Sequence, residues 1–256
     1  MTSALSARYV YKGFGTGPRR APILRGINLD VPTGQTLFLV GPSGSGKTTL
    51  LSILGCLLTP DNGSVQVRGQ EVSKMGLKEL TAFRRQHIGF IFQSFHLFPT
   101  LSALDNVCLT LTMRGMPGKQ AQKRAAEFLD QVCLGHRVHL RPAQLSTGEC
   151  QRVAVARALA TEPAILFADE PTASLDAENG QVVMHLLRDL VRQRGATLVV
   201  VTHDERIYPF ADRILHLEDG SVTREWRPAR PEPSAAEVAA TQQRGVRKER
   251  LVEVRS

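Results

Sequence analysis

Apolar and polar residues follow two different periodicities along this chain. In residues 9–31 they alternate on either side of the Gly- and Pro-rich segment 13–22, which predicts an antiparallel hairpin. Shorter runs that end in turn residues predict further strands at 37–40, 64–68, 88–92, 164–168, 197–201 and 213–217. The last of these runs is followed by the turn Glu218-Asp219-Gly220, and we expect it to be the final strand.

Helical spacing fills the segments between these strands. The helix expected from Lys47 onward stops at the turn signal 59–63, and its apolar face consists of Leu50, Leu51, Ile53, Leu54 and Leu57. Residues 101–134 also read as helical, with a packed face at Ala125, Phe128, Leu129, Val132 and Cys133. Further helices are expected after Gln144 and at 177–194.

The order of these elements predicts an α/β fold with a mostly parallel central sheet covered by helices. The hairpin adds an N-terminal antiparallel β-subdomain, and residues 94–160 add an α-helical subdomain. We expect residues 1–226 to form a single domain. Residues 227–256 are too poor in large apolar side chains to build a core, so we predict a flexible basic tail with at most a short helix at 237–242.

Composition limits the classes of protein that remain. The 256 residues are 42% hydrophobic, but no apolar run approaches the ~20 residues that cross a bilayer. No secretory signal follows the N-terminus, so we expect a cytoplasmic protein. The formal charge of +8 would suit nucleic acid or an anionic membrane surface. Much of that charge lies in the tail, and a solvated surface explains it better; binding of a membrane surface by the tail remains a hypothesis.

The four cysteines do not indicate a metal site or a disulfide framework. They are widely spaced and form no CxxC pair, and we expect small core or surface thiols at Cys56, Cys108, Cys133 and Cys150.

A phosphate-binding loop follows the apolar run 37–40. The loop consists of Gly41, Pro42, Ser43, Gly44, Ser45, Gly46, Lys47, Thr48 and Thr49. Glycines let the backbone curl so that its N–H groups converge, and the following helix points its positive end at the same place. Lys47 would reach the β- and γ-phosphates of a nucleoside triphosphate, and the Thr48 hydroxyl would hold Mg²⁺. An ordinary glycine-rich turn would not need Lys-Thr at this position.

Two adjacent acids end the predicted strand 164–168. Phosphoryl transfer to water needs a second carboxylate to fix the metal and a group to align the water, and Asp169 and Glu170 supply both. Because successive side chains diverge, Asp169 can face Mg²⁺ while Glu170 addresses the water. Alone, the pair would read as a solvated strand end, but each motif predicts the other.

A further motif is the sequence Leu-Ser-Thr-Gly-Glu-Cys-Gln-Arg at residues 145–152. With it, the chain resembles the nucleotide-binding subunit of ATP-binding cassette (ABC) transporters, and the resemblance covers nearly all of residues 9–224. Residues 145–152 stand in the place of the family's signature sequence, which other phosphate-loop ATPases lack. Ser146-x-x-Glu149 is also a capping box, so it starts a helix whose end can face an anion. The resemblance implies the P-loop NTPase fold and a site in which Ser146, Thr147, Gly148 and Glu149 close on ATP held by a second subunit.

The same resemblance assigns the remaining site residues. Gln93 matches the loop glutamine that senses Mg²⁺ and the attacking water and contacts the membrane partner. His203 matches the switch histidine that hydrogen-bonds the γ-phosphate, and Asp176 matches the loop that crosses the dimer interface. Phe14 aligns best with the aromatic residue that stacks on adenine, and Tyr11 is the alternative.

Two residues depart from the family pattern. Thr147 replaces the usual second glycine of the signature, which suggests tighter closing geometry. Cys150 replaces a common glutamine beyond the phosphate-facing turn. We interpret both as tuning, because Lys47, Asp169, Glu170 and His203 are all present.

Within the family, the phosphate loop and residues 92–97 resemble the lipoprotein-release and macrolide-export branch, with residues 203–220 similar to the DevA-type ATPases of three-component exporters. The resemblance implies an ATP- and Mg²⁺-dependent homodimer that powers transport, by inference export, through a separate membrane permease, with a periplasmic adaptor as a further partner. It implies no specific nucleic acid, and it places the chain at the inner face of the cell membrane.

Two other functions stay open at this point. One is a membrane-associated ATPase that drives a mechanical or regulatory step without moving a solute. The other is an ATPase acting on DNA or ribosomes, which the basic charge favours. DNA-repair relatives carry long coiled coils or zinc modules between the Gln93-like and signature elements, whereas this chain has only a compact helical segment there.

Overall fold

The computed structural model describes residues 3–228. Its strands are β1 (Ser3–Phe14), β2 (Ala21–Pro32), β3 (Thr36–Val40), β4 (Asn62–Val67), β5 (Gln70–Glu71), β6 (Ile88–Ile91), β7 (Ile165–Asp169), β8 (Thr197–Val201), β9 (Arg213–Glu218) and β10 (Ser221–Trp226). Its α-helices are α1 (Lys47–Leu54), α2 (Leu77–His87), α3 (Ala103–Met113), α4 (Gly118–Gln131), α5 (Thr147–Ala160) and α6 (Ala177–Gln193). The helix predicted at 237–242 and most of the predicted tail lie outside the described residues.

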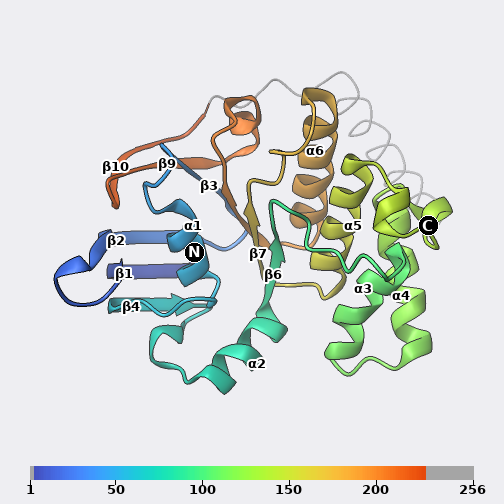
Figure 1. Cartoon of the computed structure of the whole chain (residues 1–256), viewed down its shortest axis with the longest axis horizontal. Coiled ribbons are helices and arrows are strands. Elements are labelled where there is room, and N and C mark those ends of the chain that lie inside the picture. The colour runs from blue at the N-terminus through green and yellow to red at the C-terminus, as the bar shows by residue number, and fades with distance from the viewer. Residues whose placement is uncertain (1–2, 229–256) are drawn as a thin grey trace, which may run out of the picture.

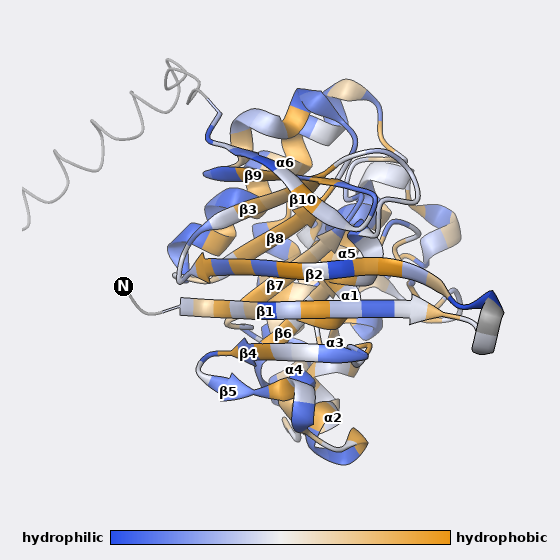
Figure 2. Ribbon diagram, turned by 90° about the vertical axis from the view of Figure 1, so that its left-hand side faces the viewer, coloured by the Kyte–Doolittle hydropathy of each residue, from blue (hydrophilic) through white to orange (hydrophobic). Residues whose placement is uncertain are grey.

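Two sheets organise the molecule (Figure 1). The central sheet has the strand order β10-β9-β3-β8-β7-β6, and every neighbouring pair from β9 to β6 is parallel. The second sheet, β2-β1-β4-β5, is antiparallel and is built on the long hairpin whose strands alternate in hydropathy (Figure 2). The α/β fold with a parallel central sheet and an N-terminal antiparallel sheet is therefore confirmed.

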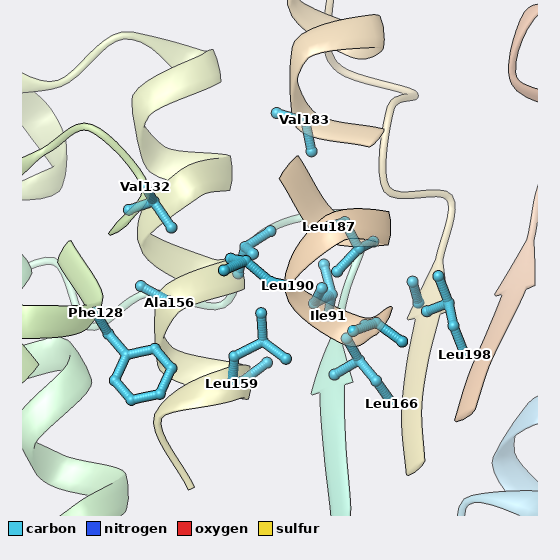
Figure 3. Packing of buried hydrophobic residues seen from close by; sticks show 14 of the residues in the cluster. Ile91, Phe128, Val132, Ala156, Leu159, Leu166, Val183, Leu187, Leu190 and Leu198 are labelled. Carbon is cyan, nitrogen blue, oxygen red and sulfur yellow. The ribbon is translucent and has the colours of Figure 1, made fainter. Parts of the chain in front are cut away.

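The parallel part of the central sheet is buried on both faces because adjacent side chains of its strands enter different cores. Phe38 and Leu198 join the core beneath α3 to α6, whereas Leu37 and Val199 join the core shared with α1 and the antiparallel sheet. Figure 3 shows the first of these cores, where Leu159 of α5 and Leu187 of α6 lie close to the strands. The carboxyl edge of the sheet is left free for the loops that follow its strands.

Several local predictions were wrong. β10 pairs antiparallel with β9, so the strand at 213–217 is not the final one. Leu57 is 47% exposed because α1 ends at Leu54 and the chain turns left-handed at Cys56. Cys133 is exposed for the same reason: it lies beyond the end of α4 with a φ of 59°. Helix α2 was not predicted at all.

No helix within residues 3–228 combines the length and the apolar character needed to cross a membrane.

Candidate functional site

The phosphate loop connects β3 to α1, and two of its glycines combine a positive φ with a neighbour that a side chain would strike. Gly41 has a φ of 139°, and a Cβ there would lie 2.0 Å from the carbonyl oxygen of Leu217. Gly46, at the start of α1, has a φ of 99°, and its Cβ would lie 2.8 Å from Leu24. Only glycine adopts such angles readily, so the loop can curl tightly against β9 and the hairpin.

The side chain of Lys47 folds back over this loop. Its Nζ atom donates hydrogen bonds of 2.8 Å to the carbonyl oxygens of both Gly41 and Pro42. Burial lowers the pKa of Lys47, while the nearby charges of Glu170 and Asp169 act in the opposite direction. The ammonium group is thus held at the loop, where a phosphate would pair with it.

Two oxygen-bearing side chains meet beside the start of α1. The Thr48 hydroxyl donates a hydrogen bond of 3.3 Å to Oδ1 of Asp169, at the end of β7. Burial is the largest influence on the pKa of Asp169 and raises it, a change that Glu170 reinforces and Thr48 opposes. A hydroxyl and a carboxylate at this distance form an oxygen donor set of the kind that Mg²⁺ prefers.

Glu170 and His203 face each other across neighbouring strand ends. His203 Nδ1 lies 2.8 Å from Oε1 of Glu170, and the backbone N–H of Glu170 donates to the carbonyl of Val201. Glu170 has a φ of 48°, a left-handed conformation that non-glycine residues rarely adopt. Its Oε2 atom is buried and has no hydrogen-bond partner among the described residues. Strain and an unpaired carboxylate oxygen at one residue indicate a functional position.

These groups line one cleft with a volume of about 670 Å³ at the carboxyl edge of the central sheet. Its lining includes most of the predicted nucleotide-binding residues: Phe14, Gly41, Pro42, Ser43, Gly44, Gly46, Lys47, Thr48, Thr49, Gln93, Asp169, Glu170 and His203. Ser45 lies buried in the same loop, and its hydroxyl has no partner among the described residues. Tyr11 is not among the lining residues, which favours Phe14 as the stacking aromatic.

The signature residues lie on a different surface and do not line this cleft. Ser146 is the N-cap of α5: its hydroxyl accepts from the N–H of Glu149 at 3.3 Å, and Glu149 accepts from the N–H of Ser146 at 2.8 Å. The predicted capping box is therefore present. Thr147 is exposed, and Gly148 packs so closely on Asn179 that a Cβ would lie 3.2 Å from the amide oxygen.

Asp176 lies beside the signature residues. It caps α6 by accepting hydrogen bonds from the N–H and the side-chain amide of Asn179, at 2.9 and 2.8 Å. Since Asn179 also contacts Gly148, the N-termini of α5 and α6 form one surface. The cleft and this surface are separate parts of the same molecule.

The local sequence offered no sign of residues whose contacts are made with partners far away along the chain. Asp61 was read only as part of a turn, yet its carboxylate accepts hydrogen bonds from Lys12 at 3.0 Å and from the N–H of Gly13 at 2.7 Å. It thereby ties down the hairpin end that carries Phe14. Ile23 and Val201 also line the cleft and carry no motif that would have identified them.

Comparisons with known proteins agree with this geometry. A family model described as "ABC transporter" matches residues 24–173. The chain is 46% identical over 213 residues to the lipoprotein-releasing system ATP-binding protein LolD of Bacteroides fragilis, covering 83% of this chain and 97% of that protein. It is 42% identical to the macrolide export ATP-binding/permease protein MacB of Pectobacterium atrosepticum, covering 98% of this chain and 39% of the longer protein.

A solved structure gives the same result for the fold. An ATP-binding cassette in a dimeric post-hydrolysis state bound to ADP and Pi superposes with a TM-score of 0.81 at 42% identity, covering 87% of this chain and 98% of that one.

Proposed function

The chain belongs to the ABC transporter family as an ATP-binding and ATP-hydrolysing subunit, and we propose that the cleft at the carboxyl edge of its central sheet is where ATP binds and is hydrolysed. The observation that supports this most directly is the meeting of four groups in that cleft. Lys47, Thr48, Asp169 and Glu170 come from two elements far apart in sequence, and all four line it. An amine, an oxygen donor pair and a carboxylate with one unpaired oxygen suit a triphosphate, its cation and a water molecule.

Each residue has a separate role in this proposal. Lys47 and the backbone N–H groups of residues 43–49 bind the β- and γ-phosphates. Thr48, Asp169 and Gln93 would hold Mg²⁺, which neutralises charge between the phosphates. Glu170 orients and polarises the attacking water, and His203 holds Glu170 and hydrogen-bonds the γ-phosphate.

Phe14, half exposed at the hairpin end, stacks on adenine. Stacking needs only an aromatic face, so it contributes affinity without strong selection among bases.

A second copy of the chain completes the site. The signature surface, formed by Ser146, Thr147, Gly148, Glu149 and Asp176, contains a capped helix end that can meet a phosphate but does not reach its own cleft. In a head-to-tail homodimer it would close on the partner's nucleotide, and loss of the γ-phosphate would let the dimer open. The dimeric assembly of the similar cassette supports this arrangement.

The relatives indicate what the dimer drives. Their names assign them to lipoprotein release and macrolide export, so we place this chain on the cytoplasmic side of the membrane, bound to a separate permease and, in a three-component system, to a periplasmic adaptor. A cycle that performs mechanical work without moving a solute is the alternative. A role on DNA is disfavoured because α3 and α4 account for the helices between Gln93 and Ser146.

Replacing Glu170 by Gln tests the function. The side chain keeps its size and its contact to His203 but can no longer act as a base. We expect ATP to bind, a dimer to accumulate, and phosphate release to slow by about a hundredfold or more. Lys47→Ala is the control, in which neither binding nor dimer formation should occur. A Glu170→Gln protein that hydrolyses ATP at the normal rate would refute the assignment.

A further inference from the structure

The loop that follows β6 has an unusual backbone. After Gln93, two consecutive residues, Phe95 and His96, have φ angles of 59° and 47°. Neither is a glycine, and a left-handed conformation is unfavourable for residues with a Cβ. Such a conformation persists only where the surrounding structure imposes it.

One side of the loop is held by stacked rings. His96 stacks on Phe92 with ring centres 4.7 Å apart, Phe92 stacks on Phe90 at 5.4 Å, and Phe90 stacks on Phe167 at 5.3 Å. Phe167 belongs to β7, which ends at Asp169. This row of rings fixes where the loop starts. It provides no hydrogen-bond donor for the backbone carbonyl oxygens of Phe95 and His96.

Arg157 satisfies them. Its guanidinium donates one hydrogen bond to the carbonyl oxygen of Phe95, at 2.6 Å, and another to the carbonyl oxygen of His96. Bonds from a charged donor are stronger than neutral ones, and the planar guanidinium can bond two acceptors from a fixed geometry. Burial lowers the pKa of Arg157, which accords with a guanidinium that lies against the protein interior.

Arg157 belongs to α5, the helix that begins after Ser146. About three helical turns separate the two residues. The helix is rigid along this length, because Val153, Val155 and Leu159 are fully buried among the neighbouring helices. A displacement at the N-terminus of α5 would therefore be carried to Arg157 and to the carbonyl groups that it holds.

We propose that Arg157 is a positioning residue for hydrolysis, which fixes the loop after Gln93 to the helix that begins after Ser146. This inference rests on the proposed function, since it assumes that Gln93 acts in the cleft and that the N-terminus of α5 meets the partner's nucleotide. The position of Gln93 in one cleft then follows the nucleotide bound in the other. Arg157 itself touches neither nucleotide.

The structure offers a matched control. Arg114 also donates hydrogen bonds to backbone carbonyls, those of Arg85, Gln86 and Thr161. These residues precede β6 and β7, at the sheet edge opposite the cleft, whereas the carbonyls held by Arg157 follow β6. Arg157→Met and Arg114→Met thus remove similar contacts from opposite ends of the same sheet. Arg157→Lys keeps a charged donor that can bond one or both carbonyls.

The test measures steady-state ATP hydrolysis, the dissociation constant for ATP and thermal unfolding for each variant. Both Met variants should unfold at lower temperature. In Arg157→Met we expect kcat to fall about tenfold or more, because misplacing a positioning group by about 1 Å has effects of that size or larger. The ATP dissociation constant should stay within about twofold, since the phosphate loop is unchanged. Arg114→Met should keep a near-normal kcat, and Arg157→Lys should recover part of the lost activity.

Three results would overturn the proposal: a kcat in Arg157→Met equal to that of Arg114→Met, a loss of ATP affinity in step with kcat, or no recovery in Arg157→Lys. If Arg157→Met does not fold, the comparison of Arg157→Lys with Arg114→Lys decides in the same way. Failure of the proposed function would look different, because the unaltered chain would then not hydrolyse ATP or Glu170→Gln would keep the full rate.

Discussion

Asp61 lies outside every recognised motif, and its replacement by Asn should affect both stability and nucleotide binding. The Asp61 carboxylate accepts hydrogen bonds from the N–H of Gly13, from Lys12 and from Arg20. All three donors lie at the end of the hairpin that carries Phe14. Asn keeps one acceptor oxygen for Gly13 but loses the charge that attracts Lys12 and Arg20.

The size of the effect follows from the pKa of Asp61. The hydrogen bond from Gly13, aided by those from Lys12 and Arg20, lowers this pKa from 3.8 to about 2. A shift of this size corresponds to at most about 2.5 kcal/mol. Solvent screens part of the interaction, so we expect Asp61→Asn to lower the free energy of unfolding by about 1 to 2 kcal/mol at pH 7.

The pH dependence has a definite sign. A carboxyl group with a lowered folded-state pKa stabilises the fold above its unfolded pKa, here 3.8, and this contribution is lost as the pH falls to about 2. The difference in stability between the unaltered chain and Asp61→Asn should therefore be constant near neutral pH and shrink below pH 3.8. Urea unfolding at several pH values measures it.

Nucleotide binding supplies a second measurement. If ordering the hairpin end on ATP binding costs about 1 kcal/mol more in Asp61→Asn, the affinity for ATP should fall about fivefold. Asp30→Asn is the control: Asp30 pairs with Arg8 on the same hairpin at 2.7 Å, but both side chains are about half exposed. That change should alter the unfolding free energy by less than about 1 kcal/mol. Equal effects of the two substitutions, or a difference that does not shrink in acid, would refute the reasoning.

Three further predictions follow from the site and the core. Phe14→Ala should weaken ATP binding by about 1 to 3 kcal/mol while Tyr11→Ala does not, as measured by nucleotide titration; the opposite order would exchange their roles. Gly41→Ala should abolish ATP binding because its Cβ would overlap the Leu217 carbonyl, whereas Gly34→Ala, at a position whose φ is also positive (79°) but whose Cβ would meet open space, should retain it. With a thiol reagent at pH 8, exposed Cys133 should react before Cys56, whose pKa burial raises to about 12; simultaneous labelling of the native protein would contradict this.

Sequence patterns predicted those structural features that are determined by residues adjacent in the sequence. The parallel strands of the central sheet are short apolar runs with mostly buried side chains, and the phosphate loop and the capping box are contiguous motifs, so each could be read directly. Helix α2 was missed because its mean hydropathy is low and only Leu80 and Phe83 are buried. β10 was missed because none of its residues is buried and three are exposed, so its pairing with β9 is what makes it a strand.

Contacts between distant residues explain the rest of what was missed. Asp61 meets Gly13 across 48 positions, and Arg157 meets Phe95 across 62. A carboxylate in a turn and an arginine on a helix are common surface features, and nothing in their local sequence marks the carbonyl or amide that each will meet. The roles of such residues became visible only once the fold had brought the partners together.

The place of β3 in the sheet has a consequence for synthesis of the protein. β3 lies between β8 and β9, and its first residue, Thr36, hydrogen-bonds Asp212, which lies 176 positions later. A ribosome that has finished the phosphate loop must therefore translate most of the remaining chain before the strand beneath that loop gains either neighbour. We expect nascent chains that stop short of β8 to be unable to retain ATP and to depend on chaperones, since β3 exposes unpaired edges until then.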